Sequence, residues 1–264
     1  MIRTVCRSGC LPGLTTSLLI AVIVLAASFA PTARAWAAGF GGMDEDSPDE
    51  AAPLMAVGDF NRDGIVDIAE ADSPAAGLSG SGSLTVSLGQ ADGSFKPMAS
   101  HLALGRAPRS IATGDFNGDG IPDLIVGDDD GAVTLFLGDG TGNLVPDGDI
   151  TRLGSAISIA VADFNHDGIL DVAISDWRAS TVTVLLGAGN GSFRRTWSFP
   201  LKEQGKVAHI STADFNKDGI PDLAVVYDDD AGSTFEVMTG NGNGTFTDAP
   251  NLSFAKDPNA HCAT

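Results

Sequence analysis

The chain has 264 residues, with 15 basic and 34 acidic side chains and a formal net charge of −19. So acidic a chain is poorly suited to nucleic acid or to anionic membrane surfaces, because both repel negative charge. We therefore expect no nucleic-acid partner. Two of the three cysteines, Cys6 and Cys10, lie in the first ten residues. Cys262 is then left without an internal partner, and we interpret it as an incidental thiol, not as a link between chains.

Residues 1–35 have the order of a secretory signal. Arg3 and Arg7 give a positive start, residues 18–30 form an apolar run (LLIAVIVLAASFA), and an Ala-Arg-Ala cleavage site closes the segment. A membrane-spanning helix needs ~20 apolar residues, so an uncleaved anchor is the less favoured alternative. We predict cleavage, a secreted protein that is extracellular or periplasmic, and no membrane span afterwards. Three arginines leave with the signal, so the exported part carries a net charge of −22.

The remainder of the chain is dominated by one repeat. Residues 36–52 (WAAGFGGMDEDSPDEAA) have no core-forming pattern and are interpreted as a flexible acidic leader. A loop reading Asp-Phe-Asn-x-Asp-Gly-Ile-x-Asp then begins at Asp59, Asp115, Asp163 and Asp214, at spacings of 56, 48 and 51 residues. The extra length of the first repeat lies in a Ser/Gly/Pro-rich loop at 72–82. We predict one domain over 53–264 with repeats at about 53–107, 108–153, 154–205 and 206–264.

Each repeat contains the same series of extended segments. In the second repeat an alternating stretch (111–116) enters the loop, an apolar run (124–126) leaves it, and a third strand (133–137) leads to a Gly-rich turn (138–144). A fourth extended stretch joins the next repeat. No sustained 3.6-residue apolar period follows residue 36. Four short strands per ~50 residues are typical of a propeller blade, so we predict an all-β fold, a β-propeller of about four four-stranded blades.

The repeated loop carries oxygen donors at its positions 1, 3, 5 and 9 and a main-chain carbonyl at position 7. Ca²⁺ takes six to eight oxygen ligands, and Gly at position 6 permits the tight turn that would gather them. A plain Asn-x-Asp-Gly turn is the alternative, but a turn gives no reason for three aspartates to recur four times. We predict up to four Ca²⁺ ions, one per repeat. The predicted ligands are Asp59, Asn61, Asp63, Ile65 and Asp67; Asp115, Asn117, Asp119, Ile121 and Asp123; Asp163, Asn165, Asp167, Ile169 and Asp171; Asp214, Asn216, Asp218, Ile220 and Asp222.

The first loop also satisfies an EF-hand pattern, with Gly64 at position 6 and Glu70 at position 12. The residues at position 12 of the other loops are Val126, Ile174 and Val225. An EF-hand needs a helix on each side, whereas these flanks have strand character. We therefore interpret Glu70 as a coincidence. The variable position 4 holds Arg62, Gly118, His166 and Lys217, which indicates a solvent-facing place and not a ligand.

The segments at 115–124 (DFNGDGIPDL), 214–223 and 184–193 (VLLGAGNGSF) resemble the FG-GAP or VCBS repeat, the calcium-binding blade of integrin-alpha-like propellers. The resemblance extends from Leu54 to about Phe254. It implies that Ca²⁺ lies in the hairpin between the first two strands of each blade, in an exported protein of adhesion, recognition or scaffolding. Integrin-like propellers have seven blades and this chain has four. The alternatives are a closed ring of four, an open arc, a pairing of two copies and a shortened relative. Closure or pairing is favoured, because an open arc exposes blade edges.

The sequence gives little support for catalysis. There is no Gly-x-Ser-x-Gly, no His-Glu-x-x-His and no paired cysteine, and His209 is interpreted as a strand residue. The acidic runs at 128–130 and 228–230 are interpreted as solvated turns. We predict a secreted calcium-binding repeat protein and not an enzyme. It would act as a binding, adhesion or scaffolding module for an extracellular protein or glycan, with self-pairing as a further expectation. The alternatives are a lectin-like propeller, which would use the unrepeated residues Trp177, Arg178, Trp197 and Tyr227, and, less favoured, a propeller hydrolase.

Overall fold

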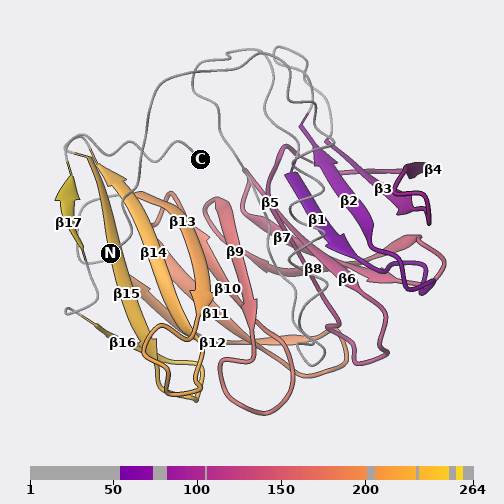
Figure 1. Ribbon diagram of the computed structural model, residues 1–264. Coiled ribbons are helices and arrows are strands. Elements are labelled where there is room, and N and C mark those ends of the chain that lie inside the picture. The colour runs from indigo at the N-terminus through magenta and orange to yellow at the C-terminus, as the bar shows by residue number, and fades with distance from the viewer. Residues whose placement is uncertain are drawn as a thin grey trace. The chain divides into compact units, whose positions relative to one another are not determined.

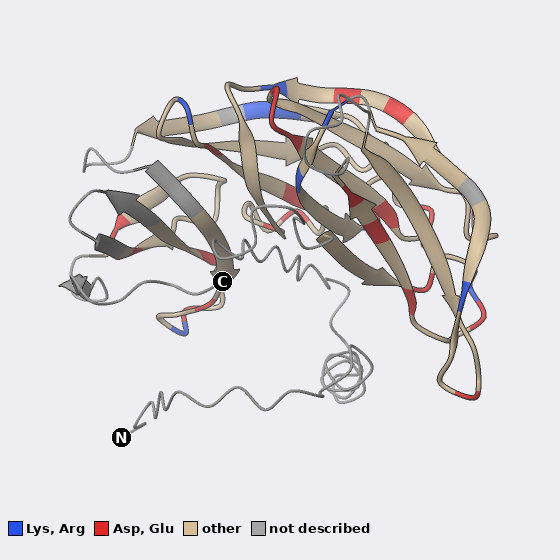
Figure 2. Ribbon diagram, turned by 90° about the horizontal axis from the view of Figure 1, so that it is seen from above, with Lys and Arg blue, Asp and Glu red and all other residues tan. Residues whose placement is uncertain are grey.

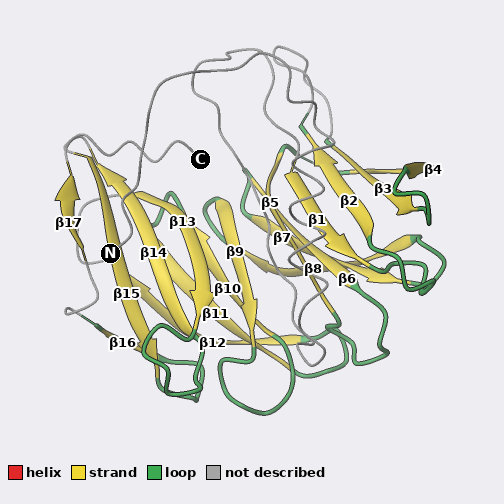
Figure 3. Ribbon diagram, in the orientation of Figure 1, coloured by secondary structure: helices red, strands yellow, loops and turns green. Residues whose placement is uncertain are grey.

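The computed structural model describes residues 54–73, 82–104, 106–200, 206–229, 232–249 and 254–257. The expected signal, the acidic leader, most of the 72–82 loop and Cys262 lie outside these residues, as do the side chains of Tyr227 and of residues 228–230. All the regular elements described are β-strands (Figure 3), so the all-β prediction is confirmed. Since this part of the chain has no helix, it has none that could cross a membrane.

The strands run in chain order as follows. They are β1 (Leu54–Gly58), β2 (Asp67–Asp72), β3 (Ser83–Gly89), β4 (Phe95–Ala103), β5 (Pro108–Gly114), β6 (Asp123–Asp128), β7 (Ala132–Gly138), β8 (Leu144–Arg152), β9 (Ala156–Ala162), β10 (Asp171–Asp176), β11 (Thr181–Gly187), β12 (Phe193–Pro200), β13 (Lys206–Ala213), β14 (Asp222–Asp229), β15 (Gly232–Gly240), β16 (Phe246–Asp248) and β17 (Phe254–Asp257).

The strands form four antiparallel sheets, each made of consecutive strands. The sheets β1–β4, β5–β8 and β9–β12 have four strands in sequence order, and the sheet β13–β16 has β17 as an additional partner of β15. Every sheet thus holds one copy of the repeated loop, between its first and second strands. The prediction of four-stranded propeller blades is confirmed, and we number the blades 1 to 4 along the chain.

The first strands of the blades lie beside one another in series, β1 against β5, β5 against β9 and β9 against β13 (Figure 1). Small residues make this approach possible. A Cβ added at Gly114 in β5 would lie only 2.6 Å from Cδ1 of Leu170 in the next blade. No comparable contact leads from β13 back to β1 among the described residues. One chain therefore supplies a partial propeller of four blades.

The blades are held together by three apolar clusters, one at each junction. The two faces of one strand serve different clusters, because alternate side chains point to opposite sides. In β5, Ile111 joins the cluster shared with blade 1, whereas Ala112 joins the cluster shared with blade 3. Complete burial of a Leu or Phe side chain contributes roughly 1.5–3 kcal/mol. Face-to-face packing, more than hydrogen bonding between blades, therefore stabilises the series.

Two features of the strand ends complete the description. The apolar run after the first loop starts at Ile65, but β2 begins only at Asp67, because the main-chain N–H of Ile65 bonds to Oδ1 of Asp63 inside the loop. The fourth strand of blade 4 is short: β16 has three residues, and β17 pairs separately with β15. Blade 4 is thus the least regular of the four at its outer edge.

Candidate functional site

All four Asp-Phe-Asn loops connect the first strand of a blade to the second (Figure 3, green). The first loop lies between β1 and β2, so its flanks are strands and an EF-hand is excluded. Glu70 lies within β2, is half-buried, and pairs in register with Met55 of β1. The interpretation of Glu70 as a non-ligand is therefore supported by its place in the sheet.

The carboxylate at position 1 gives the loop its shape. Oδ1 of Asp59 accepts the N–H of Asp63 at 3.0 Å, and Oδ2 accepts the N–H of Gly64 at 2.9 Å. The same pair of bonds recurs in the other loops at 2.8–3.1 Å. Gly64 has φ of +83°, a conformation that costs glycine nothing. Position 4 is also left-handed, at φ of 60° in Arg62, although it is not glycine there, so the loop imposes this conformation.

The side chains at positions 3 and 5 bond to each other and to the main chain beside them. Asn61 donates from Nδ2 to Oδ2 of Asp63 at 2.9 Å, and its Oδ1 accepts the N–H of Asp63 at 3.0 Å. Oδ1 of Asp63 in turn accepts the N–H of Ile65 at 2.8 Å. The other loops repeat all three bonds. Three polar side chains from positions 1, 3 and 5 thus converge on one short stretch of main chain.

The aspartate at position 9 is different, because it is completely buried in every loop. Oδ2 of Asp123 accepts the N–H of Phe116 at 2.9 Å, and Oδ1 accepts the N–H of Gly138 at 2.9 Å. Corresponding bonds occur at Asp67, Asp171 and Asp222. Each of these carboxylates therefore ties the loop to the start of the Gly-rich turn after the third strand.

The sequence did not reveal the role of the glycine that this carboxylate contacts. A Cβ at Gly138 would lie 2.3 Å from the carbonyl oxygen of Pro122, and the equivalent glycines are as tightly confined. The available signal was the recurrence of glycine at this place in all four repeats (89, 138, 187 and 240). Its partner lies 15 to 22 residues earlier in the chain, which hides the connection.

Negative charge accumulates in the loops. Burial raises the pKa of Asp123 and of Asp171 to about 6; main-chain hydrogen bonds oppose this rise only in part, and nearby carboxylates such as Asp119 and Asp167 add to it. Burial also raises the pKa of Asp67. Figure 2 shows acidic residues in red and basic residues in blue. The ion pairs of the described residues join Arg106 and Arg152 to Asp130 and Asp149, and none reaches a loop aspartate.

The donor set of the loops suits a hard divalent cation. It offers three carboxylates, one amide oxygen and one main-chain carbonyl, which are the oxygen ligands that Ca²⁺ prefers. In the described conformation no three carboxylates stand ready around a single point. The carboxylate oxygens at positions 1 and 5 instead face N–H groups of their own loop, and those at position 9 face N–H groups of the loop and of the glycine after the third strand. Carboxylate oxygens can accept more than one bond. The Asn61–Asp63 side-chain contact is the one that a bound cation would compete with.

The structure places the other sequence candidates as follows. The ring of Trp197 lies 4.3 Å from that of Phe199 and 5.8 Å from that of Phe246, within the packing between blades 3 and 4. Trp177 is half-buried, beside exposed Arg178. Asp128 caps its own turn by accepting the N–H groups of residues 130 and 132, as expected for a turn residue. His209 lies in β13 as expected, and burial lowers its pKa.

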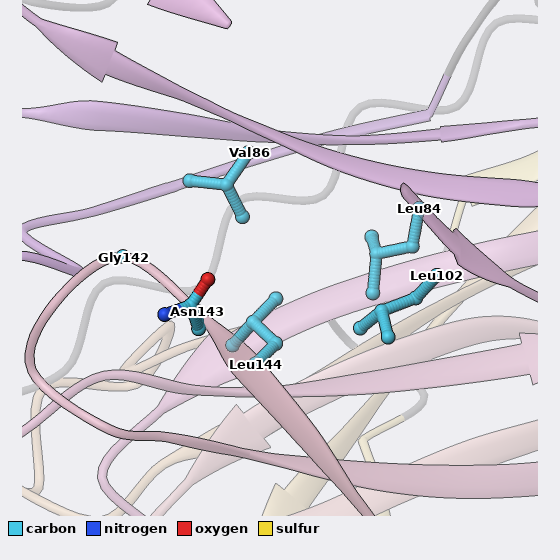
Figure 4. Close-up of a pocket in the computed structure, with 6 residues that line it drawn as sticks. All are labelled: Leu84, Val86, Leu102, Gly142, Asn143 and Leu144. Carbon is cyan, nitrogen blue, oxygen red and sulfur yellow. The ribbon is translucent and has the colours of Figure 1, made fainter. Parts of the chain in front are cut away.

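A small pocket lies between blades 1 and 2 (Figure 4). It offers about 40 Å³, room for a water molecule or two. Its lining residues are Leu84, Val86, Leu102, Gly142, Asn143 and Leu144. None of them titrates, so this pocket offers no acid, base or nucleophile.

Comparison with known proteins agrees with this architecture. The model of a family described as FG-GAP-like repeat matches residues 59–126, 115–174 and 172–225, which together span more than half of the chain. The first two matches begin at position 1 of a loop, at Asp59 and Asp115. A search of curated proteins finds no match. Repeats of this kind are blades of β-propellers, as the sheets here are. On the strength of the three matches, this chain belongs to the FG-GAP-like repeat family.

Proposed function

We propose that the protein is an exported calcium-binding module that serves binding, adhesion or scaffolding, with one Ca²⁺ stabilising each blade. One observation carries the proposal: four loops of identical donor pattern each hold three carboxylates that no basic side chain of the described residues neutralises. The partner would be an extracellular protein or glycan. The family of propeller-type repeats supports a binding role in general.

The residues at positions 1, 3, 5, 7 and 9 would hold the ion. Bound Ca²⁺ supplies the positive charge that relieves repulsion between the carboxylates. The position-9 carboxylate already bonds to the Gly-rich turn, as Asp123 does to Gly138, so an ion held there would connect the first hairpin of the blade to its third strand. The expected consequence is a stiffer and more stable blade.

Export is the second part of the proposal, and it is supported by the signal-like order of residues 1–35. Without internal disulfides, an exported chain needs another source of stability. Extracellular calcium modules bind with Kd values of about 10⁻⁴–10⁻³ M. Loops of this kind would therefore fill outside the cell.

Thermal unfolding in Ca²⁺ and in chelator tests the calcium proposal. At a free concentration ten times Kd, each independent site adds about 1.4 kcal/mol to the free energy of unfolding, so millimolar Ca²⁺ acting at four sites should raise the Tm clearly and chelator should reverse the rise. Mg²⁺ at the same concentration is the control for general charge screening. An unchanged Tm in both directions would refute the proposal.

Calorimetric titration of loop variants locates the sites. Asp119→Asn removes one carboxylate from the second loop and should lower the stoichiometry from four to three. Asp92→Asn is the matched control, because Asp92 is an exposed residue of a Gly-rich turn outside the loops. Equal stoichiometry in the two variants would show that the second loop does not bind Ca²⁺.

A further inference from the structure

The three junctions between blades use one repeated contact. The carbonyl of the loop phenylalanine accepts an N–H from a glycine in the Gly-rich turn of the following blade, at 3.0 Å each time. The pairs are Phe60 with Gly142, Phe116 with Gly191, and Phe164 with Gly244. The three phenylalanine side chains are at most 1 % exposed. A junction thus joins a loop phenylalanine to the turn of the next blade.

The ring of the loop phenylalanine meets an apolar side chain at the end of that turn. Phe116 lies 5.7 Å from Phe193, and Phe164 lies 5.3 Å from Phe246 in an edge-on arrangement. Phe60 shares its cluster with Leu144, which has the same place in blade 2. Aromatic pairs of this kind contribute beyond their buried area.

Blade 4 has the phenylalanine, but no turn of a following blade lies against it among the described residues. Phe215 is 39 % exposed, and no described residue donates to its carbonyl. Ser211 and Ala213, on the same face of β13, are exposed as well, whereas Ala160 and Ala162 at their places in β9 are buried. We call Ser211, Ala213 and Phe215 the tail face.

Blade 1 has the turn, but no phenylalanine precedes it among the described residues. The N–H of Gly93 bonds back to the carbonyl of Gln90 at 2.9 Å, within its own turn. Phe95, at the place of buried Leu144 and Phe246, is only half-buried, and so are Met55 and Val57 of β1. We call Met55, Val57 and Phe95 the head face. The head and tail faces are the two halves of the contact that joins the blades within the chain.

Polar residues at the two faces also match. At the junction of blades 3 and 4, Oγ of Ser158 accepts the N–H of Ile210 at 3.1 Å, and Ile210 pairs in register with Val225. Blade 4 carries His209 at the place of Ser158 in the repeat, and Nδ1 of His209 lies 3.2 Å from Oγ of Ser158 in blade 3.

Blade 1 carries an acidic residue at the matching place of its own outer face. Met55 occupies the place of Ile210, and it pairs in register with Glu70, at the place of Val225. A further junction of the same geometry would therefore bring His209 close to Glu70, so two residues that depart from the repeat would face each other.

A second charge pair follows from position 4 of the loops. A Cβ at Gly140 would lie 3.4 Å from Cδ of Arg62, so Arg62 of blade 1 lies beside the turn of blade 2, which carries Asp139. In blade 4 this position is Lys217. In the turn of blade 1, Gln90 stands at the place of Asp139, Ala91 stands at the place of Gly140, and exposed Asp92 follows Ala91. The further junction would therefore bring Lys217 beside Ala91 and next to the acid Asp92.

We propose that the tail face of one copy of this chain docks on the head face of a second copy. Phe215 would pack on Phe95, Lys217 would lie near Asp92, and the N–H of Gly93 would exchange the carbonyl of Gln90 for that of Phe215. The partner is a second copy because the two faces are the halves of one contact, and within the described part of one chain β13 and β1 make no such contact. Two copies, each with one head and one tail, close into a two-fold ring of eight blades, within the range of four to eight in known propellers.

One residue of the head turn departs from the repeat. Ala91 stands where Gly140, Gly189 and Gly242 have φ between 69° and 75°. In the same turn the N–H of Gly93 bonds to the carbonyl of Gln90, and not to a loop phenylalanine as in the other blades. The chain accepts left-handed residues other than glycine at Arg62, His166 and Lys217, so Ala91 does not bar the rearrangement.

Light scattering on the purified chain, in Ca²⁺ and in chelator, measures the association. We expect a mass twice that of one chain. Phe215→Glu and Phe95→Glu should each give monomers, while Val145→Glu, which changes another exposed apolar residue (55 % exposed), should remain dimeric. A wild-type monomer at 100 µM in both conditions, or a dimer that survives Phe215→Glu, would overturn the proposal.

Mixing the variants distinguishes the arrangements. Phe215→Glu keeps an intact head and Phe95→Glu an intact tail, so the mixture should form a dimer although neither variant does so alone. A dimer of tail against tail would survive Phe95→Glu, and that result would contradict head-to-tail docking.

Circular dichroism checks that the Phe→Glu variants fold. If one of them does not, the exposed pair Lys217 and Asp92 provides a second test of the same docking. Lys217→Asp should weaken association at least tenfold, and Lys217→Asp with Asp92→Lys should restore it; no recovery would refute the pairing. Association does not depend on the calcium proposal. A dimer in a chain that binds no Ca²⁺ would refute only the proposed function.

Discussion

Blades 1 and 4 have the same strands and the same loop, yet their outer faces differ. Blade 1 replaces interior residues by polar ones: Glu70 stands at the place of Val126, and Ser87 at the place of Phe136. Blade 4 retains the small and aromatic residues of an interior face, including Phe215. The terminal units of repeat proteins carry a polar outer face where they meet water. By that criterion blade 4 retains a face suited to a neighbour, whereas blade 1 combines polar residues such as Glu70 with the half-buried apolar residues of the head face.

The largest difference in unfolding free energy should come from exchanging Val and Glu between a buried junction and the outer face of blade 1. Val126 is buried at the junction of blades 1 and 2, so Val126→Glu places an unpaired carboxylate there and should lower the free energy of unfolding by about 3–5 kcal/mol. Glu70→Val should change it by less than about 1 kcal/mol, because Glu70 is half-buried at an outer face. Urea unfolding at low protein concentration measures both. Equal effects would mean that the face of blade 1 is an interior face after all.

The next largest difference in unfolding free energy should come from truncating the loop phenylalanine of an inner blade and that of blade 4. Phe116→Ala empties a buried site between blades 2 and 3 and should cost about 3–5 kcal/mol. Phe215→Ala removes a ring that is partly in water and should cost the monomer less than about 1 kcal/mol. The measurement is made below the concentration at which copies associate. A large loss in Phe215→Ala under those conditions would show that Phe215 has a covering contact within its own chain.

The smallest effect is the pH dependence of the unfolding free energy, and it concerns Asp123 of blade 2, an inner blade. The pKa of Asp123 is raised to about 6, against about 3.9 in an unfolded chain. Between these values the folded state binds a proton that the unfolded state has lost. Without cation, the contribution of Asp123 to stability is therefore greatest at low pH and falls as pH rises from about 4 to 6.

The difference in unfolding free energy between wild type and Asp123→Asn, measured in chelator from pH 4.5 to 7.5, isolates this contribution. The pH profile of the wild type alone would not isolate it, because the lowered pKa of His209 changes the unfolding free energy with pH in the opposite direction. With Ca²⁺ present the trend should reverse, since protons compete with the cation for the same oxygens. A difference that is constant with pH would contradict the raised pKa.

The sequence predicted the features that depend on neighbours close along the chain. The four loops, the four strands per repeat and the place of each Gly-rich turn all follow from local spacing and turn chemistry. The bond from Asp67 to Gly89 did not follow, because it joins residues 22 positions apart. The meaning of Glu70 was also missed, since it depends on which blade face lacks a neighbour. Phe215 looks identical to Phe116 in the sequence, and only the packing separates an exposed ring from a buried one.

The buried carboxylate at position 9 has a mechanical consequence. Its bonds stay within one blade, as from Asp171 to Gly187, whereas neighbouring blades share one main-chain bond at the loop phenylalanine and an apolar cluster, to which the Ser158 hydroxyl adds bonds between blades 3 and 4. Under a pulling force we expect the joints between blades to open before any hairpin unravels. Extension would then proceed in steps of one whole blade, and each released blade would keep its shape and be able to dock again.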